Sequence, residues 1–186
     1  MALRIEKTFL VQEPVEAVWA FLSDPRKVAT CVPGAQITEQ VDDKTYTGAI
    51  RVKVGPSVTD YKGEVQILRL DAPSHEIEIL GKGRDVRGRG SASMKMTGKL
   101  NVPATGGTEI TSVSEINVVG ILAQMGSRVI TEVSNIMFEE FTKNFQARLK
   151  DLQTPAEPRL GASDPKPINA PSVAWAAAKG FFRGKS

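Results

Sequence analysis

The sequence predicts an α+β protein of the helix-grip type, in which a curved antiparallel sheet of seven strands wraps around one long C-terminal helix. Three observations predict this fold. Residues 3–12 alternate apolar and polar side chains like a strand, and six similar segments fill 36–120. Residues 121–152 then change to helical periodicity, with no proline among them. Because a bent sheet must cover its concave face, the one long helix is its expected cover.

Two short helices are expected directly after the first strand. Pro14 suits the first position of a helix, and apolar side chains follow it at helical spacing. Asp24 and Pro25 then end this helix and begin a second one that runs to about Ala29. The predicted order is therefore one strand, two short helices, six strands and a long helix.

Turn residues separate the six later strands. The turns are expected at Asp42-Asp43, Gly55-Pro56, Ala72-Pro73-Ser74, Arg87-Gly88 and Thr105-Gly106-Gly107. The helix over 121–152 carries one broad apolar stripe and would be about 45 Å long at a rise of about 1.5 Å per residue.

One face of the predicted sheet collects small side chains. Counting every second residue along the strands places on this inner face Gly63, Gly81, Gly83, Ala92, Ser112 and Ser114. Large residues there would close the concave side, whereas small ones leave a cavity that flexible methionines can shape around an irregular ligand. The alternative is that the glycines only let the sheet bend, and that the core closes over them. The pattern alone leaves both interpretations open.

The expected cavity takes its lining from the inner face of the strands, the first helix and the long helix. Its predicted lining residues are Phe21, Tyr61, Ile79, Met94, Met96, Met125, Ile130, Val133 and Met137. Among them, Tyr61 is the best candidate for a polar contact with a ligand.

The sequence offers no constellation of residues for catalysis or metal binding. His75 is the only histidine and lies in a turn predicted to be solvated, and Cys31 is interpreted as a buried small apolar residue. Without further His or Cys, neither a zinc site nor an iron–sulfur site of the usual type can form. The protein is therefore predicted not to be an enzyme.

One basic segment resembles a phosphate-binding loop. The segment GKGRDVRGRG at 81–90 has Val86 where the third glycine of such a loop belongs, so it fails the comparison. It is interpreted as a hairpin tip that carries Lys82, Arg84, Arg87 and Arg89. This tip is either a solvated turn or a basic rim beside the cavity mouth, where it would meet a lipid head group or an acidic partner.

The excess positive charge is confined to the C-terminal part of the chain. Residues 154–186 contain five bases and two acids, whereas 1–153 contain equal numbers of both, so the tail carries the whole formal net charge of +3. Nucleic acid is not an expected partner, because phosphate binding needs a concentrated basic surface. No apolar segment is long enough to span a bilayer and no export signal is recognised, so a cytoplasmic location is expected.

Three regions are predicted: a ligand-binding domain over 1–152, a proline-rich flexible linker over 153–170, and a basic amphipathic tail over 171–186. The tail is expected to dock on a membrane surface through Trp175, Lys179, Phe181, Phe182, Arg183 and Lys185. Its few aromatic side chains and bases suit weak, reversible binding. Alternatively, the tail packs on its own domain or on a partner enzyme.

Two stretches carry a resemblance to a known family. They are VPGAQITEQVDDKTYTGAIRVKVGPSVTDYKGEV at 32–65 and VVGILAQMGSRVI at 118–130. Both resemble the carbon monoxide dehydrogenase G-subunit family, which belongs to the START-like, or SRPBCC, ligand-binding superfamily. The resemblance covers about residues 2–150. It implies an accessory protein of a molybdenum-containing hydroxylase at the inner face of the cytoplasmic membrane, and it favours a cavity over a closed core.

The predicted function combines the cavity, the tail and this resemblance. A soluble hydroxylase must pass its electrons to a quinone in the bilayer, so the cavity is expected to bind a lipid quinone, menaquinone or ubiquinone. The protein would carry it between the cytoplasmic membrane and the dehydrogenase. One alternative is an adaptor that recruits the dehydrogenase to the membrane without a physiological ligand. Another is an enzyme of the aromatase/cyclase type, for which the sequence offers no acid/base residues in the cavity.

Overall fold

The computed structural model describes residues 1–55 and 57–153. Contacts group Met1–Leu152 into one compact unit. The predicted linker from residue 154 onward and the predicted membrane-docking tail at 171–186 lie outside the described residues.

The described residues form seven strands and four helices. The strands are β1 (Ala2–Val11), β2 (Ala35–Gln40), β3 (Thr45–Val54), β4 (Ser57–Asp71), β5 (Glu76–Asp85), β6 (Gly90–Asn101) and β7 (Thr108–Gly120). The helices are α1 (Val15–Leu22), α2 (Pro25–Ala29), α3 (Ile121–Gln124) and α4 (Ser127–Gln153). This order confirms the predicted sequence of one strand, two short helices and six strands.

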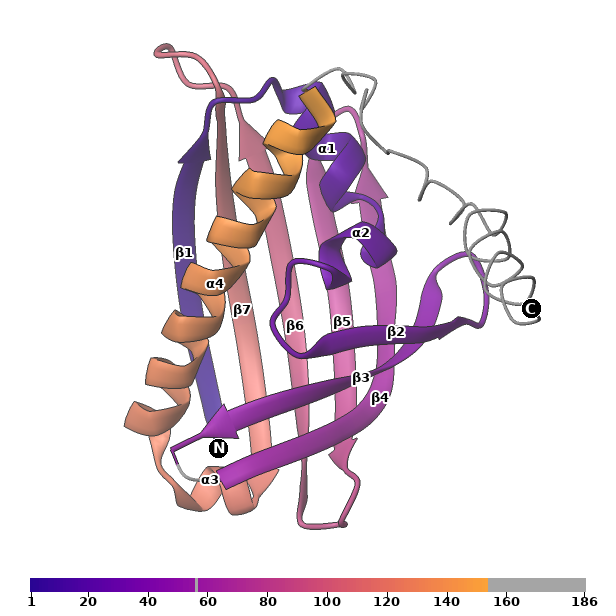
Figure 1. Cartoon of the computed structure of the whole chain (residues 1–186), viewed down its shortest axis with the longest axis vertical. Coiled ribbons are helices and arrows are strands. Elements are labelled where there is room, and N and C mark those ends of the chain that lie inside the picture. Colours follow the sequence, from indigo (N-terminus) through magenta and orange to yellow (C-terminus); the bar gives the residue numbers. More distant parts are fainter. Residues whose placement is uncertain (56, 154–186) are drawn as a thin grey trace, which may run out of the picture. The chain divides into compact units, whose positions relative to one another are not determined.

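All strands belong to one sheet, with the order β1-β7-β6-β5-β4-β3-β2, and every neighbouring pair is antiparallel. Figure 1 shows α4 crossing the face of β1 and β7, with α1 and α2 near its C-terminal end and β3 and β4 curling towards its beginning. The sheet therefore grips the long helix, which confirms the helix-grip prediction.

Proline and aspartate residues mark the beginnings of the two short helices. Asp24 precedes α2, and its carboxylate accepts a hydrogen bond from the backbone N–H of Arg26 at 3.0 Å. Pro25 occupies the first position of α2, where its missing N–H has no partner to lose. Pro14 itself is extended and directly precedes α1, so this helix begins at Val15, one residue later than predicted.

The prediction of one continuous helix over 121–152 is wrong at its beginning. Gly126 has φ of +85°, which a right-handed helix does not allow, so the chain forms the short α3 and then the 27-residue α4. At a rise of about 1.5 Å per residue, α4 is about 40 Å long. The break changes the direction of the chain between the end of β7 and the long helix.

The core between sheet and helices divides into two clusters. The first, here the α1-end cluster, comprises Val11, Val15, Val18, Phe21, Cys31, Leu100, Ile110, Phe145 and Leu149. The second, here the α3-end cluster, comprises Val54, Tyr61, Val118, Leu122 and Ile130. In the first, Phe145 of α4 is fully buried, with its ring centroid 5.2 Å from that of Phe21. Burying such a ring contributes about 1.5–3 kcal/mol. The α1-end cluster therefore holds the C-terminal part of α4, and the α3-end cluster holds its beginning through Ile130.

A polar contact holds the middle of α4 to the edge strand β1. Lys7 lies on the inner face of β1, where its ammonium donates to Asn135 Oδ1 at 2.7 Å and lies 5.3 Å from the ring centroid of Phe138. The long aliphatic part of a lysine can cover apolar surface while its charge stays near water. Lys7 therefore adds a polar contact between β1 and α4.

Candidate functional site

The inner face of the sheet consists of rows that run across the strands. Between the two clusters, the register of β4 to β7 aligns three such rows. The first row is Val65, Gly81, Met94 and Ile116, and the second row is Ile67, Ile79, Met96 and Ser114. The third row is Ile77, Gly98 and Ser112. The predicted assignment of inward-facing residues on these strands is confirmed by this register. The small residues predicted for the inner face thus lie side by side.

The middle of the inner face is less buried than its two ends. We define the central strip as Ile79, Gly81, Met94, Met96, Gly98, Ser112 and Ser114, all of which are half-buried although they face inward. At the two ends, Val118 is 2% exposed and Leu100 is 4% exposed. The described residues therefore cover the ends of the concave face more fully than its middle.

Five glycines of the sheet fall into two physical classes. A Cβ on Gly48, Gly63 or Gly90 would overlap a carbonyl oxygen of the neighbouring strand, so these glycines allow the strands to approach closely where the sheet bends. A Cβ on Gly81 would find its nearest heavy atom at 3.9 Å, and one on Gly98 would find none within 4 Å. Curvature explains the first class, whereas the second class leaves room for a side chain, with open space at Gly98.

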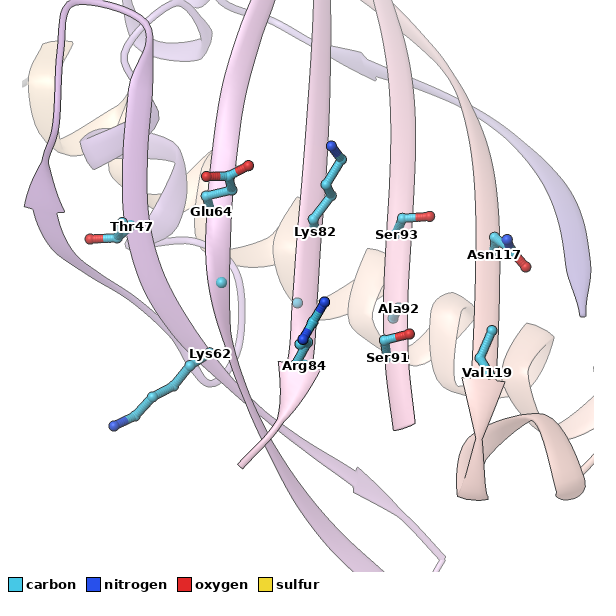
Figure 2. A pocket seen from close by; sticks show the side chains of 12 residues that line it. Thr47, Lys62, Glu64, Lys82, Arg84, Ser91, Ala92, Ser93, Asn117 and Val119 are labelled. Carbon is cyan, nitrogen blue, oxygen red and sulfur yellow. The ribbon is translucent and has the colours of Figure 1, made fainter. Parts of the chain in front are cut away.

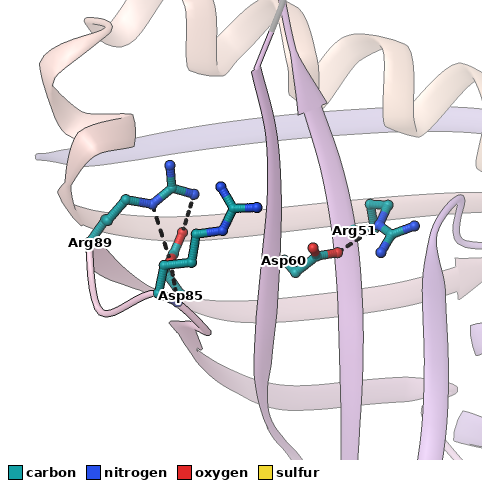
Figure 3. A network of polar contacts seen from close by, with 5 residues as sticks. Arg51, Asp60, Asp85 and Arg89 are labelled. Atoms are coloured by element: carbon teal, nitrogen blue, oxygen red, sulfur yellow. Dashed lines mark hydrogen bonds and ion pairs between the residues drawn. The ribbon is translucent and has the colours of Figure 1, made fainter.

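A buried polar pair lies at the α3 end of the concave face. Tyr61 and Asp85 are direct neighbours across β4 and β5, and each is 4% exposed. Asp85 accepts hydrogen bonds from Arg89 Nη2 at 3.0 Å and from the backbone N–H of Arg87 at 2.7 Å (Figure 3). The hydrogen bond from Arg89 is the main reason that the pKa of Asp85 is lowered. Asp85 is therefore a carboxylate whose charge Arg89 neutralises.

The hydroxyl of Tyr61 has no such partner. Its Oη atom is buried and makes no hydrogen bond in the described part of the chain. Burial raises the pKa of Tyr61, the charge of Asp85 raises it further, and the charge of Arg89 opposes both. Tyr61 therefore stays protonated and can donate its hydroxyl hydrogen to an acceptor that enters from the concave side.

A family model that describes the G subunit of carbon monoxide dehydrogenase (CoxG) matches residues 8–150. The chain belongs to the CoxG family. The match confirms the resemblance that the sequence carries. None of the curated proteins compared with the chain matches it.

Solved structures share the fold of this CoxG family member at low sequence identity. A conserved protein from Geobacillus kaustophilus has a TM-score of 0.73 and 20% identity, covering 80% of this chain and 96% of that one. The Zhui aromatase/cyclase from Streptomyces sp. R1128 has a TM-score of 0.59 and 13% identity, covering 81% and 94%. A START superfamily protein from Mycobacterium smegmatis has a TM-score of 0.56 and 12% identity, covering 80% and 98%. These likenesses show that the fold is START-like.

The structure distributes the predicted lining residues over the concave face. Ile79, Met94 and Met96 lie in the central strip. Tyr61 and Ile130 belong to the α3-end cluster, with Met125 and Val133 packed against it. Phe21 belongs to the α1-end cluster, and Met137 is half-buried on α4. Gly98 and Asp85 also face inward and were not singled out from the sequence, although both continue the alternation of their strands.

The predicted basic hairpin tip is not one structural unit. Lys82 and Arg84 lie within β5 and point to the outer face of the sheet, while the loop to β6 carries only Arg87 and Arg89. Arg89 turns back to pair with Asp85. The four bases therefore do not form a common rim.

Two further predictions concern His75 and Cys31. Cys31 is fully buried, as predicted, and burial is the main reason that its pKa is raised. His75 is not simply solvated, because its ring packs against Trp19 with centroids 5.3 Å apart. Within residues 1–55 and 57–153, no group of three or more His, Cys, Asp or Glu side chains is placed to hold a metal ion. None of the helices described is both long and apolar enough to cross a membrane.

Proposed function

We propose that this protein is a non-catalytic accessory protein that binds a lipid quinone on its concave face and presents it to a molybdenum hydroxylase of the carbon monoxide dehydrogenase type. The observation that carries the proposal is the open space at Gly98 and the room for a side chain at Gly81, in a strip of apolar and small residues between the two buried clusters. Membership in the CoxG family supports an accessory role.

The chemistry of the central strip favours a long apolar ligand. Met94 and Met96 have flexible side chains that adapt to an irregular occupant, and Ile79 adds further apolar surface. Burying a CH2 group contributes about 0.8 kcal/mol, so one prenyl unit of five carbons supplies about 4 kcal/mol. The isoprenoid chain would therefore dominate the affinity, and menaquinone and ubiquinone would bind with similar strength.

The polar end of a quinone matches the free hydroxyl of Tyr61. A quinone carries carbonyl oxygens that accept hydrogen bonds and carries no donor that would need a partner. The Tyr61 hydroxyl is a buried donor without an acceptor in the described part of the chain. In the proposed complex, Tyr61 donates to a carbonyl oxygen of the quinone head group.

Tyr61→Phe is expected to change stability and binding in opposite directions. Without ligand, the variant should be more stable by about 1 kcal/mol, since the substitution removes a buried hydroxyl that has no partner among the described residues. Its affinity for menaquinone should fall about tenfold, because the hydrogen bond to the head group is lost. Urea unfolding and quinone titration measure the two effects. A variant that is less stable than the wild type would show that the hydroxyl already has a native partner.

The tail is proposed to bring the domain to the membrane. It lies outside the described residues, so the proposal rests on its aromatic and basic side chains. Removing residues 171–186 is expected to abolish flotation with vesicles that contain anionic phospholipid, because three bases near such a surface supply about 1 kcal/mol each. The circular dichroism spectrum should keep the signal of the folded sheet. Unchanged flotation would assign membrane binding to another part of the protein.

Uptake of quinone from vesicles separates the carrier from an adaptor. The purified full chain is mixed with vesicles that contain menaquinone, the vesicles are removed by centrifugation, and the quinone left with the protein is measured by its absorbance. A carrier retains quinone in the supernatant, whereas an adaptor binds vesicles and dehydrogenase but retains none. An aromatase/cyclase reaction is less well supported, because Asp85, the carboxylate beside Tyr61, already pairs with Arg89.

A further inference from the structure

The outer face of the sheet contains a hollow that faces away from the concave side. Its volume is about 590 Å3. Figure 2 shows that two rows of side chains cross the strands here. One row is Thr47, Glu64, Lys82, Ser93 and Asn117, and the other contains Lys62, Arg84, Ser91 and Val119. We call this surface the outer hollow.

Four bases elsewhere on the sheet are each paired with an acid. Arg51 pairs with Asp60 at 2.6 Å (Figure 3), and Lys95 pairs with Glu78 at 2.7 Å. Further strand bases, Arg69 and Lys99, are paired with acids in the same way. By contrast, the side chains of Lys62, Lys82 and Arg84 form no ion pair or hydrogen bond in the part of the chain that the structure describes. Arg4 on β1 and Lys53 on β3 are likewise without a side-chain partner among the described residues, but they lie outside the hollow.

The register places two of these bases directly opposite each other. Lys62 on β4 and Arg84 on β5 are cross-strand neighbours, and like charges in such positions destabilise a sheet. Glu64 is the one acidic residue among the described residues that line the hollow, against three bases. The outer hollow therefore keeps an excess of positive charge that the described residues do not neutralise.

The floor of the hollow offers further unoccupied hydrogen-bond donors. The hydroxyls of Ser91 and Ser93 and the side-chain amide of Asn117 line it, and none of them makes a hydrogen bond within residues 1–55 and 57–153. The backbone of Gly63, Gly83 and Ala92, whose side-chain positions face the concave side, forms part of the floor. Cationic walls and a floor of neutral donors are complementary to carboxylate oxygens.

We propose that the outer hollow docks an acidic segment of the dehydrogenase, with partner carboxylates between Lys62 and Arg84. The proposal rests on the proposed association with that enzyme, but not on the quinone. Carboxylates from a partner would neutralise the opposed bases, which explains why the free protein leaves them unpaired. A flat bilayer would not reach the recessed floor, so a protruding protein segment fits the hollow better than a membrane does.

The test compares binding of the full chain to purified carbon monoxide dehydrogenase by surface plasmon resonance at low salt. Lys62→Glu should weaken binding about tenfold, and the double variant Lys62→Glu with Arg84→Glu should weaken it further and reduce its salt dependence. Lys62→Glu also places a carboxylate opposite Arg84, so it should raise the Tm of the free protein by about 1–4 °C. A variant that is more stable but binds less cannot owe its loss to misfolding.

A matched control reverses two charges elsewhere. Arg128→Glu with Lys143→Glu changes the net charge by the same amount on exposed residues of α4, and it should leave dehydrogenase binding within twofold of the wild type. Equal losses in the control and the hollow variants would overturn the proposal in favour of a net-charge effect. If the hollow variants bind the dehydrogenase as tightly as the wild type, the docking proposal is wrong, but the association with the enzyme still holds. If the wild type does not bind the dehydrogenase, both the docking proposal and the proposed association are wrong. Loss of binding to anionic vesicles alone would assign the hollow to the membrane instead.

Discussion

Replacing Gly63 with alanine is expected to destabilise the domain by more than about 3 kcal/mol. A Cβ at this position would overlap the carbonyl oxygen of Lys82 on β5 and crowd Gly83 next to it. Backbone atoms cannot move aside like the end of a flexible side chain, so β4 and β5 would have to separate where the sheet bends. Urea unfolding of the variant and the wild type measures the loss.

Gly81→Ala provides the matched control on the neighbouring strand. Its new Cβ would meet nothing closer than 3.9 Å, so the variant should be as stable as the wild type or more stable by about 0.5–1 kcal/mol. A small and equal effect at both positions would contradict the division of the glycines into two classes. A loss at Gly81 as large as at Gly63 would show that the concave side is already filled.

Gly81→Ile is expected to lower the affinity for menaquinone about 30-fold without loss of the fold. Its Cβ has room at this position, and the rest of the side chain should extend over the central strip and displace two or three carbons of the ligand, each worth about 0.8 kcal/mol. β-Branched residues suit a strand, so the free protein should fold normally. Uptake of menaquinone from vesicles measures the effect, and Gly98→Ile should act in the same direction.

Thr97→Ile is the control for this change. Thr97 lies on β6 between two residues of the central strip, but its side chain is exposed on the outer face. The isoleucine of this variant adds the same side chain to the sheet without entering the concave side, so quinone uptake should not change. Equal uptake by Gly81→Ile and the wild type would place the ligand elsewhere or exclude it.

The fold and the faces of its strands could be predicted because alternation and turn residues are local signals. The inner face of β5 and β6 follows from counting every second residue, which is how Ile79, Met94 and Met96 were placed. The break at Gly126 could not be predicted in this way, since a glycine inside an apolar stripe is compatible with a continuous helix. Only the positive φ of Gly126 in the structure shows that the helix is broken there and not continuous.

The polar details of the site depend on contacts between distant segments. The sequence marked Tyr61 as a polar candidate, but it did not show that the hydroxyl lacks a partner or that Asp85 lies opposite. Gly63 and Gly81 look alike in the sequence and differ only in how close the neighbouring backbone is. The opposition of Lys62 and Arg84 likewise follows from the register of β4 and β5, which a list of residues does not contain.

Mass spectrometry of lipids extracted from the purified full chain shows whether the protein carries a quinone. The wild-type protein should contain a lipid quinone in near-equimolar amount, and Gly81→Ile should contain much less after the same purification. Membrane phospholipids without quinone, or the same quinone content in both proteins, would contradict the proposed quinone binding. Only an adaptor role would then remain for this member of the CoxG family.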